Sequence, residues 1–282
     1  NSKFLHRDSI TFIIKLALTA ASHKLPHHST MSSQDKAKTS YAQVATAYDG
    51  YAQTPAGIIE AQLIARALGP GDLTGLHVLD LGGGSGIHAR ECIDYGAESV
   101  DIVDISPEML KIASNIEESL GREGKIRFFE ADVSKPLSEY NHPLREKYDV
   151  VMANWIFSHA DKRSTLEGMF ANIGAYLKPG GIFVGIRDAN PFSHEFKRGK
   201  YGAHTGWVKE IEGGVKYWAV LHCKPEPVEF EVASLEIIYG GSKELYENAG
   251  LTKIVEMSLE RSFFGCCACC EDLDPGSYWK AL

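Results

Sequence analysis

A glycine-rich turn preceded by an acid is the part of the sequence whose residue types most clearly suggest chemistry. Residues 77–90 read HVLDLGGGSGIHAR, an apolar segment that leads into four glycines and then into a helical pattern. Glycine has no Cβ, so a backbone built from it can approach a ligand closely. Such a turn between a strand and a helix is typical of a nucleoside- or nucleotide-binding site.

Two glycine frames can be read in this turn, and they predict different ligands. Gly84, Gly86 and Ala89 fit the G-x-G-x-x-A pattern of dinucleotide-binding proteins, whereas Gly82, Gly84 and Gly86 form a second frame that Asp80 precedes. The Asp80 carboxylate would repel a pyrophosphate but would attract an ammonium or sulfonium group. The second frame, and with it a cationic cofactor, is therefore favoured.

Two further acids end the next two apolar segments. Asp104 ends the second segment, at the spacing expected for an acid that binds a ribose in either frame. Asp132 ends the third segment and could accept a hydrogen bond from the exocyclic amine of an adenine. The carboxyl ends of parallel strands meet at one edge of a sheet, where ligands bind. These acids therefore predict one nucleoside site.

The elements that must position these residues alternate regularly between strands and helices. Apolar segments at 76–81, 99–105, 126–132, 148–154 and 181–186 read as strands buried on both faces, with helical patterns between them. This alternation predicts an α/β, Rossmann-like, doubly wound and mostly parallel sheet with helices on both faces. Residues 215–223, 228–238 and 253–260 read as later strands, which predicts an antiparallel edge. Residues 37–68 read as two helices.

The chain has one predicted domain and one predicted extension. Residues 1–30 resemble a transit or signal peptide in composition, and Met31 begins a stretch that looks like a new start. We expect residues 1–30 to be a disordered extension with no place in the fold. Residues 31–282 are expected to form a single domain, with a cofactor-binding core at about 76–186 and a substrate-side segment at about 187–240.

Composition narrows the classes of partner. The net charge is −8, whereas a nucleic-acid-binding protein usually presents a basic face. No apolar run reaches the ~18 residues of a membrane span. Six cysteines, four of them in the CCACC stretch at 266–270, fit a reducing compartment, and no second cysteine pair completes a zinc site. We expect a cytoplasmic protein with no nucleic-acid partner, no membrane contact and no metal.

Five motifs in order resemble those of class I S-adenosylmethionine-dependent methyltransferases. They read VLDLGGGSG, VDISPEML, ADV, YDVVMANWIFSHA and LKPGG, and they lie within residues 76–186. The whole chain, including YAQVATAYDGYA ahead of the fold, is similar to small-molecule methyltransferases of the toxoflavin-synthase and quinone-biosynthesis kind. The resemblance implies S-adenosylmethionine as cofactor and a monomer or homodimer as the assembly.

The resemblance also implies a role for each matched residue. Asp80 would hold the methionine ammonium, while Gly82 and Gly84 would let the cofactor lie along the backbone. Asp104 would take both ribose hydroxyls. The other implied cofactor contacts are Ile105 and Met109 on the adenine, Asp132 and the Val133 amide at its edge, Asn154 at the methionine end, and Tyr41 and Tyr48 closing over the cofactor.

One residue is a candidate for proton transfer. Methyl transfer from a sulfonium is an in-line displacement, and positioning alone can supply as much as ~7–11 kcal/mol. A base is needed only for an acceptor that is protonated at neutral pH. His159 follows the fourth strand and is the candidate base or substrate anchor, or else a cap of the next helix. His88 departs from the motif, which commonly has a hydrophobic residue there.

The leading hypothesis is a methyltransferase that acts on an O or N atom of a small, planar organic molecule. One alternative is an NAD(P)-dependent oxidoreductase that uses the Gly84-x-Gly86-x-x-Ala89 frame, although no convincing Tyr-x-x-x-Lys pair accompanies it. A second alternative is a non-catalytic, methyltransferase-like partner protein. A protein acceptor is a further possibility for the leading hypothesis.

Overall fold

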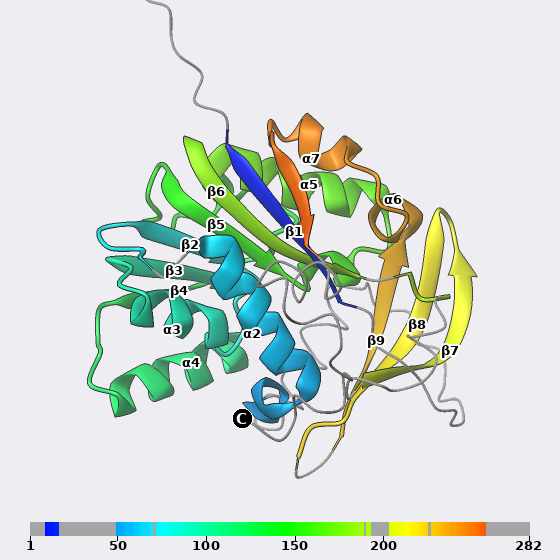
Figure 1. Ribbon diagram of the computed structural model, residues 1–282, viewed down its shortest axis with the longest axis horizontal. Helices are drawn as coiled ribbons and strands as arrows, with labels where there is room; N and C mark the ends of the chain where they lie inside the picture. Colours follow the sequence, from blue (N-terminus) through cyan, green and yellow to red (C-terminus); the bar gives the residue numbers. More distant parts are fainter. Residues whose placement is uncertain are drawn as a thin grey trace, which may run out of the picture.

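The computed structural model describes residues 9–16, 49–69, 72–188, 190–192, 203–224 and 227–257. Within them the chain forms a seven-stranded sheet in the order β10-β1-β6-β5-β2-β3-β4 and a three-stranded sheet in the order β7-β8-β9 (Figure 1). The strands of the large sheet are β1 (Ile10–Leu16), β2 (His77–Leu81), β3 (Ser99–Asp104), β4 (Ile126–Glu130), β5 (Tyr148–Asn154), β6 (Leu177–Asp188) and β10 (Ile254–Met257).

The predicted doubly wound α/β fold is confirmed. The described pairs of the large sheet are parallel, and every strand except the edge strand β10 buries side chains on both faces. Val78 packs into one layer and its neighbour Leu79 into the other. The first layer contains apolar residues of α2 (Pro55–Leu68), α3 (Ile87–Asp94) and α4 (Pro107–Ser119), and the second contains residues of α5 (Arg163–Tyr176), α6 (Glu236–Tyr239) and α7 (Glu244–Asn248).

Local signals fix the helix starts that place the site. The Ser106 hydroxyl accepts a hydrogen bond from the Met109 amide, and Pro107 is the first residue of α4, as the sequence predicts. Thr54 and Pro55 start α2 in the same way. Of the two helices predicted within 37–68, the described part contains the 3₁₀ turn η1 (Asp49–Gln53) and α2. Two more 3₁₀ turns are η2 (Leu137–Glu139) and η3 (Ile156–His159).

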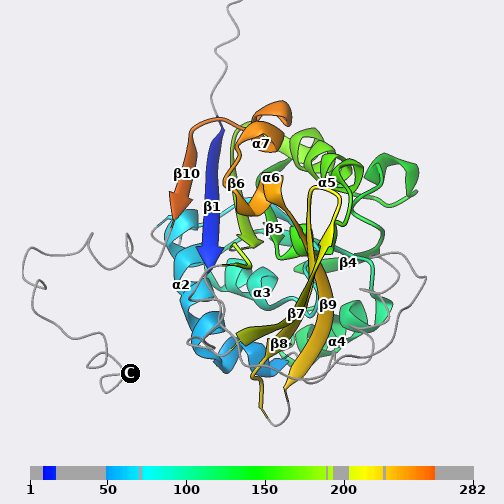
Figure 2. The ribbon, with the colours of Figure 1, turned by 90° about the vertical axis from the view of Figure 1, so that its right-hand side faces the viewer.

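The placement of the antiparallel strands differs from the prediction. Antiparallel pairing occurs in a separate sheet of β7 (Ala203–Ile211), β8 (Gly214–Leu221) and β9 (Val228–Leu235), which lies nearest the viewer in Figure 2. The last strand, β10, runs parallel to β1. Because α7 covers a face of the large sheet before β10 begins, the chain enters β10 from the same end as the other strands.

The prediction that residues 1–30 lie outside the fold is wrong for β1. Residues 10–16 pair in parallel with β6 on one side and with β10 on the other. Ile13 and Ile14 are buried. This apolar segment is too short for a membrane span, but an interior strand of a sheet needs only a few residues. Residues 1–8 and 17–30 and the CCACC stretch lie outside the described residues.

Two further observations concern the described part of the chain as a whole. None of its helices combines the length and the apolar composition that crossing a bilayer requires. No group of three or more His, Cys, Asp or Glu side chains within it lies close enough together to hold a metal ion.

Candidate cofactor-binding site

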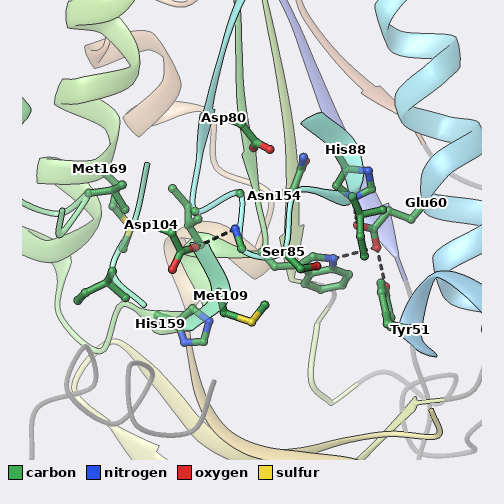
Figure 3. Close-up of a pocket in the computed structure, with 18 of the residues that line it drawn as sticks. Tyr51, Glu60, Asp80, Ser85, His88, Asp104, Met109, Asn154, His159 and Met169 are labelled. Carbon is green, nitrogen blue, oxygen red and sulfur yellow. Dashed lines mark hydrogen bonds and ion pairs between the residues drawn. The ribbon is translucent and has the colours of Figure 1, made fainter. Parts of the chain in front are cut away.

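The carboxyl ends of β2, β3, β4 and β5 surround one cavity (Figure 3). It contains about 940 Å³ of empty space, the solvent at its mouth included. Every predicted site residue that the structure describes lines this cavity: Asp80, Gly82, Gly84, Asp104, Ile105, Met109, Asp132, Val133, Asn154 and His159. The other two, Tyr41 and Tyr48, lie outside the described residues.

The glycine loop between β2 and α3 has a backbone that only glycine adopts easily. Gly82, Gly84 and Gly86 have φ angles of +71°, +52° and +80°. A Cβ at Gly82 would overlap the Cγ2 atom of Ile156, and one at Gly84 would lie 3.1 Å from the Met109 Cε atom. The loop therefore forms a smooth floor where a ligand can lie against the main chain.

Asp80 is a buried acid with an unsatisfied oxygen. Its side chain is 1% exposed, and Oδ2 has no hydrogen-bond partner among the described residues. The pKa of Asp80 is raised to about 6, chiefly by burial; the charge of His88 opposes this shift and the charge of Asp104 adds to it. An unpaired buried carboxylate is unfavourable. A cation bound in the cavity would relieve this cost.

Asp104 is held rigidly at the end of β3. Its Oδ2 atom accepts a hydrogen bond from the Gly84 amide at 2.9 Å, and its Oδ1 atom accepts one from the Ser106 amide at 2.8 Å. Burial raises the pKa of Asp104, and these two amides oppose that shift. Each carboxylate oxygen retains a second lone pair. The side chain can therefore accept two more hydrogen bonds, for example from the two hydroxyls of a ribose.

The loop after β4 is anchored from α5. Asp132 Oδ1 accepts a hydrogen bond from the Ser134 amide at 2.9 Å. The side-chain amide of Asn172 donates to the carbonyl oxygens of Val133 and Lys135, at 2.9 and 2.7 Å. Sequence reasoning missed Asn172, because one polar residue in the buried stripe of a helix has no motif to mark it. It fixes the position of the Asp132–Val133 edge of the cavity.

Asn154, the last residue of β5, and His159 of η3 complete this edge of the sheet. Both polar atoms of the Asn154 side-chain amide are buried and have no partner within the described part of the chain. His159, in η3, lines the same cavity, and burial lowers its pKa to about 4. The imidazole is therefore neutral near pH 7, in a form that can accept a hydrogen bond.

The opposite side of the cavity contains residues that sequence reasoning did not identify. Figure 3 shows Tyr51, Glu60 and His88 on one side and Asp104, Met109 and His159 on the other. Glu60 had no recognisable signal, because it lies in an ordinary amphipathic helix. The sequence marks His88 only as a departure from the glycine motif.

These observations fit S-adenosylmethionine. The unsatisfied Asp80 carboxylate suits the methionine ammonium, the unpaired Asn154 amide suits the polar methionine end, and Asp104 suits the ribose. The glycine floor leaves room for the chain of atoms between them. A pyrophosphate would instead meet two acids in this cavity.

The sequence of this part of the chain matches a known family. Residues 78–181 match the family described as methyltransferase domain. The chain is 36% identical over 127 residues to a ribosomal protein L11 methyltransferase of Deinococcus radiodurans, and this alignment covers 44% of each protein. It is 33% identical over 109 residues to a sterol 24-C-methyltransferase of Gibberella zeae, covering 39% of this chain and 27% of that protein. The chain thus aligns with less than half the length of these curated relatives.

A solved structure is also similar. It is an S-adenosylmethionine-dependent methyltransferase from Clostridium acetobutylicum, with a TM-score of 0.47 and 17% sequence identity, covering 76% of this chain and 86% of that chain. The family match spans the glycine loop and the three polar strand ends at Asp104, Asp132 and Asn154. Over residues 78–181, this chain therefore matches a methyltransferase domain, and its cavity residues suit S-adenosylmethionine.

Proposed function

We propose that the whole chain is an enzyme that transfers a methyl group from S-adenosylmethionine to an O or N atom of a small, planar organic molecule. The observation that carries the cofactor part is the buried Asp80 carboxylate, which has an unsatisfied oxygen beside a floor of glycines. When bound, S-adenosylmethionine supplies a methyl group on a cationic sulfur that a nucleophile attacks in line.

The acceptor part of the proposal rests on the apolar wall of the cavity. Tyr51, Trp155 and Ile156 line it, and Tyr217 of β8 packs in the same cluster as Tyr51 and Trp155. Aromatic walls favour planar ligands, which stack on them. The small antiparallel sheet supports this wall, and we therefore assign the substrate side of the site to it.

His159 has an orienting role in this proposal. Its imidazole is neutral at physiological pH, because burial lowers its pKa to about 4. Such a group is a weak base, since catalytic bases work best with a pKa near the working pH. We infer that His159 accepts a hydrogen bond from the acceptor's O–H or N–H and turns the nucleophilic lone pair toward the methyl group. The bond from the methyl carbon to sulfur would break as the bond to the acceptor forms, and the acceptor's proton would then pass to water.

Calorimetry tests the cofactor part first. The chain is expected to bind S-adenosylmethionine and S-adenosylhomocysteine but not NADPH, and the Asp104→Asn variant is expected to bind at least tenfold more weakly. Asp94→Asn is the matched control, because Asp94 is an exposed residue of α3 that pairs with Arg122 outside the cavity. Binding of NADPH without S-adenosylhomocysteine would refute the proposal and support the oxidoreductase alternative.

A transfer assay tests the acceptor part. Methyl-labelled S-adenosylmethionine would be incubated with the chain and with separate pools of phenols, N-heterocycles, sterols and arginine-rich peptides. We expect label in the phenol or N-heterocycle pool. Label in the sterol or peptide pool would contradict the proposed acceptor class but not the methyltransferase activity, and the absence of label from every pool would favour the non-catalytic alternative.

A further inference from the structure

Glu60 joins three separate elements at one wall of the cavity (Figure 3). Its Oε2 atom accepts hydrogen bonds from the Tyr51 hydroxyl at 2.5 Å and from the Trp155 indole nitrogen at 2.9 Å, and its Oε1 atom lies 2.8 Å from His88 Nε2. These groups belong to η1, to the residue after β5 and to the first turn of α3. The Glu60 side chain is 1% exposed, so one buried carboxylate connects all three.

The contact with His88 is an ion pair. His88 Nδ1 lies 2.9 Å from Glu91 Oε2, while Nε2 faces Glu60. Ionised carboxylate oxygens only accept hydrogen bonds, so both ring nitrogens must carry a hydrogen and the imidazole is positively charged. The residue that departs from the glycine motif is therefore the cationic partner of Glu60.

Trp155 has a backbone conformation that is unfavourable for its residue type. Its φ angle is +64°, in the left-handed region where bulky side chains are rare. Such a conformation persists only where its surroundings fix it. Three hydrogen bonds hold Trp155 in place. Its indole N–H donates to Glu60, and its peptide N–H donates to the Ile186 carbonyl at 3.3 Å. Its carbonyl accepts a hydrogen bond from the Ser158 hydroxyl at 2.5 Å.

Asn154 directly precedes this turn. Its side-chain amide is buried against the cavity, and neither of its polar atoms has a partner within the described residues. Since no hydrogen bond holds the amide, its direction follows from the backbone on both sides of it: the pairing of Asn154 with Ile186 of β6, and the turn at Trp155. Of the bonds that hold this turn, the indole bond to Glu60 is the one made by the Trp155 side chain.

We propose that Glu60 is a positioning residue for the cofactor: by fixing the Trp155 turn, it directs the Asn154 amide at the methionine end of the site. This inference rests on the proposed function. If Glu60 were purely structural, it would hold α2 against the rest of the fold through Tyr51 and His88. Its replacement would then weaken cofactor binding equally with and without the Asn154 side chain.

A double-mutant cycle separates these two roles. Glu60→Gln, Asn154→Ala and the double variant would be titrated with S-adenosylhomocysteine by calorimetry, after circular dichroism has shown that each is folded. We expect Glu60→Gln alone to weaken binding at least tenfold and to weaken it less than twofold further in the Asn154→Ala background. The NMR signal of the Trp155 indole N–H, assigned from Trp155→Phe, is expected to shift in Glu60→Gln.

Glu91→Gln is the matched control, because Glu91 contacts His88 but makes no hydrogen bond described here to Tyr51 or Trp155. It is expected to retain affinity within twofold and to leave the indole signal unchanged. A folded Glu60→Gln variant with wild-type affinity would overturn the inference, and so would full additivity with Asn154→Ala.

If Glu60→Gln does not fold, Trp155→Phe replaces it in the cycle. Phenylalanine keeps the ring but removes the indole donor to Glu60. Wild-type affinity in Trp155→Phe would then overturn the inference. Failure of the wild-type chain itself to bind S-adenosylhomocysteine would instead refute the proposed function, and the inference with it.

Discussion

Asp104 accepts a hydrogen bond from the Gly84 amide, with 2.9 Å between Oδ2 and the nitrogen. This bond links the end of β3 to the glycine loop that follows β2, two segments that are 20 residues apart in sequence. The acid that would bind the ribose in the proposed function thus also shapes the loop on which the cofactor would lie. The two parts of the site cannot be altered independently.

Cofactor binding is expected to depend on the ionisation of Asp80. The pKa of Asp80 in the unbound protein is about 6, and a bound ammonium group favours the ionised carboxylate. Below about pH 6 binding must therefore displace a proton, so affinity for S-adenosylhomocysteine should fall, by up to about tenfold per pH unit. Calorimetry between pH 5 and pH 8 measures this dependence.

The Asp80→Asn variant provides the comparison for this pH dependence. It should bind at least tenfold more weakly at pH 8, and its affinity should change less with pH, because only the raised pKa of Asp104 remains. Asp94→Asn again serves as the control. A wild-type affinity that stays constant across this pH range would show that Asp80 does not hold the ammonium.

The His88 ion pair predicts how stability depends on pH. Burial lowers the pKa of His88, but the hydrogen bonds to Glu60 and Glu91 outweigh it and raise the pKa to about 10. The ion pair contributes its full amount to the free energy of unfolding below about pH 6.5, where the unfolded chain also binds the proton. This contribution declines as pH rises, since the unfolded chain loses the proton first, and it is lost above about pH 10.

The loss of this His88 contribution should lower the free energy of unfolding by on the order of 4–5 kcal/mol between about pH 6.5 and about pH 10. Urea unfolding of the wild type and of His88→Gln at several pH values measures it. The variant should be less stable at pH 6.5 and should show a flatter dependence. Parallel curves for the two proteins would contradict a charged His88.

Gly82 is expected to tolerate alanine poorly, for two reasons that a control can separate. Its φ angle of +71° strains any residue with a Cβ, and that Cβ would overlap Ile156 Cγ2. Gly121 has a φ angle of +64° with open space around it, so Gly121→Ala introduces the strain without the overlap. We expect Gly121→Ala to lower the free energy of unfolding by about 1 kcal/mol, within the usual range for backbone strain.

Gly82→Ala should lower the free energy of unfolding by about 1–3 kcal/mol more than Gly121→Ala, as overpacked buried sites do. It should also weaken S-adenosylhomocysteine binding, since Ile156 lines the cavity. Urea unfolding and calorimetry on both variants measure these effects. Equal destabilisation by the two substitutions would mean that Ile156 moves aside without difficulty.

His159→Gln separates substrate orientation from cofactor binding. The variant should bind S-adenosylhomocysteine as the wild type does, while its turnover with an O–H or N–H acceptor falls by about tenfold, less than the loss of a strong general base. Because the pKa of His159 is about 4, wild-type turnover should show no inflection from this group between pH 6 and pH 8. An inflection there that disappears in His159→Gln would identify His159 as a titrating base.

The parts of the fold that could be predicted from the sequence are those with a local pattern. Residues adjacent in the chain determine the strand β2, which contains Asp80, and the helix that begins after Ser106. The parallel order of the strands then brings both to one edge of the sheet. The pair formed by Glu60 and His88 joins residues 28 apart, and no local pattern marks such a contact. β7 was missed because Gly206 and the charges after Trp207 obscure the alternation of a strand.

The position of β1 has a consequence for how the chain can be divided. Among the described strands, β10 pairs only with β1, and β1 pairs with β6 on its other side. A protein expressed from Met31 would lack β1, so that β10 would lose its neighbour and β6 would present an open edge. Open edges recruit strands from other molecules. A synthetic peptide of residues 9–16 should therefore rejoin such a fragment, which makes the sheet a system for complementation between two pieces of the chain.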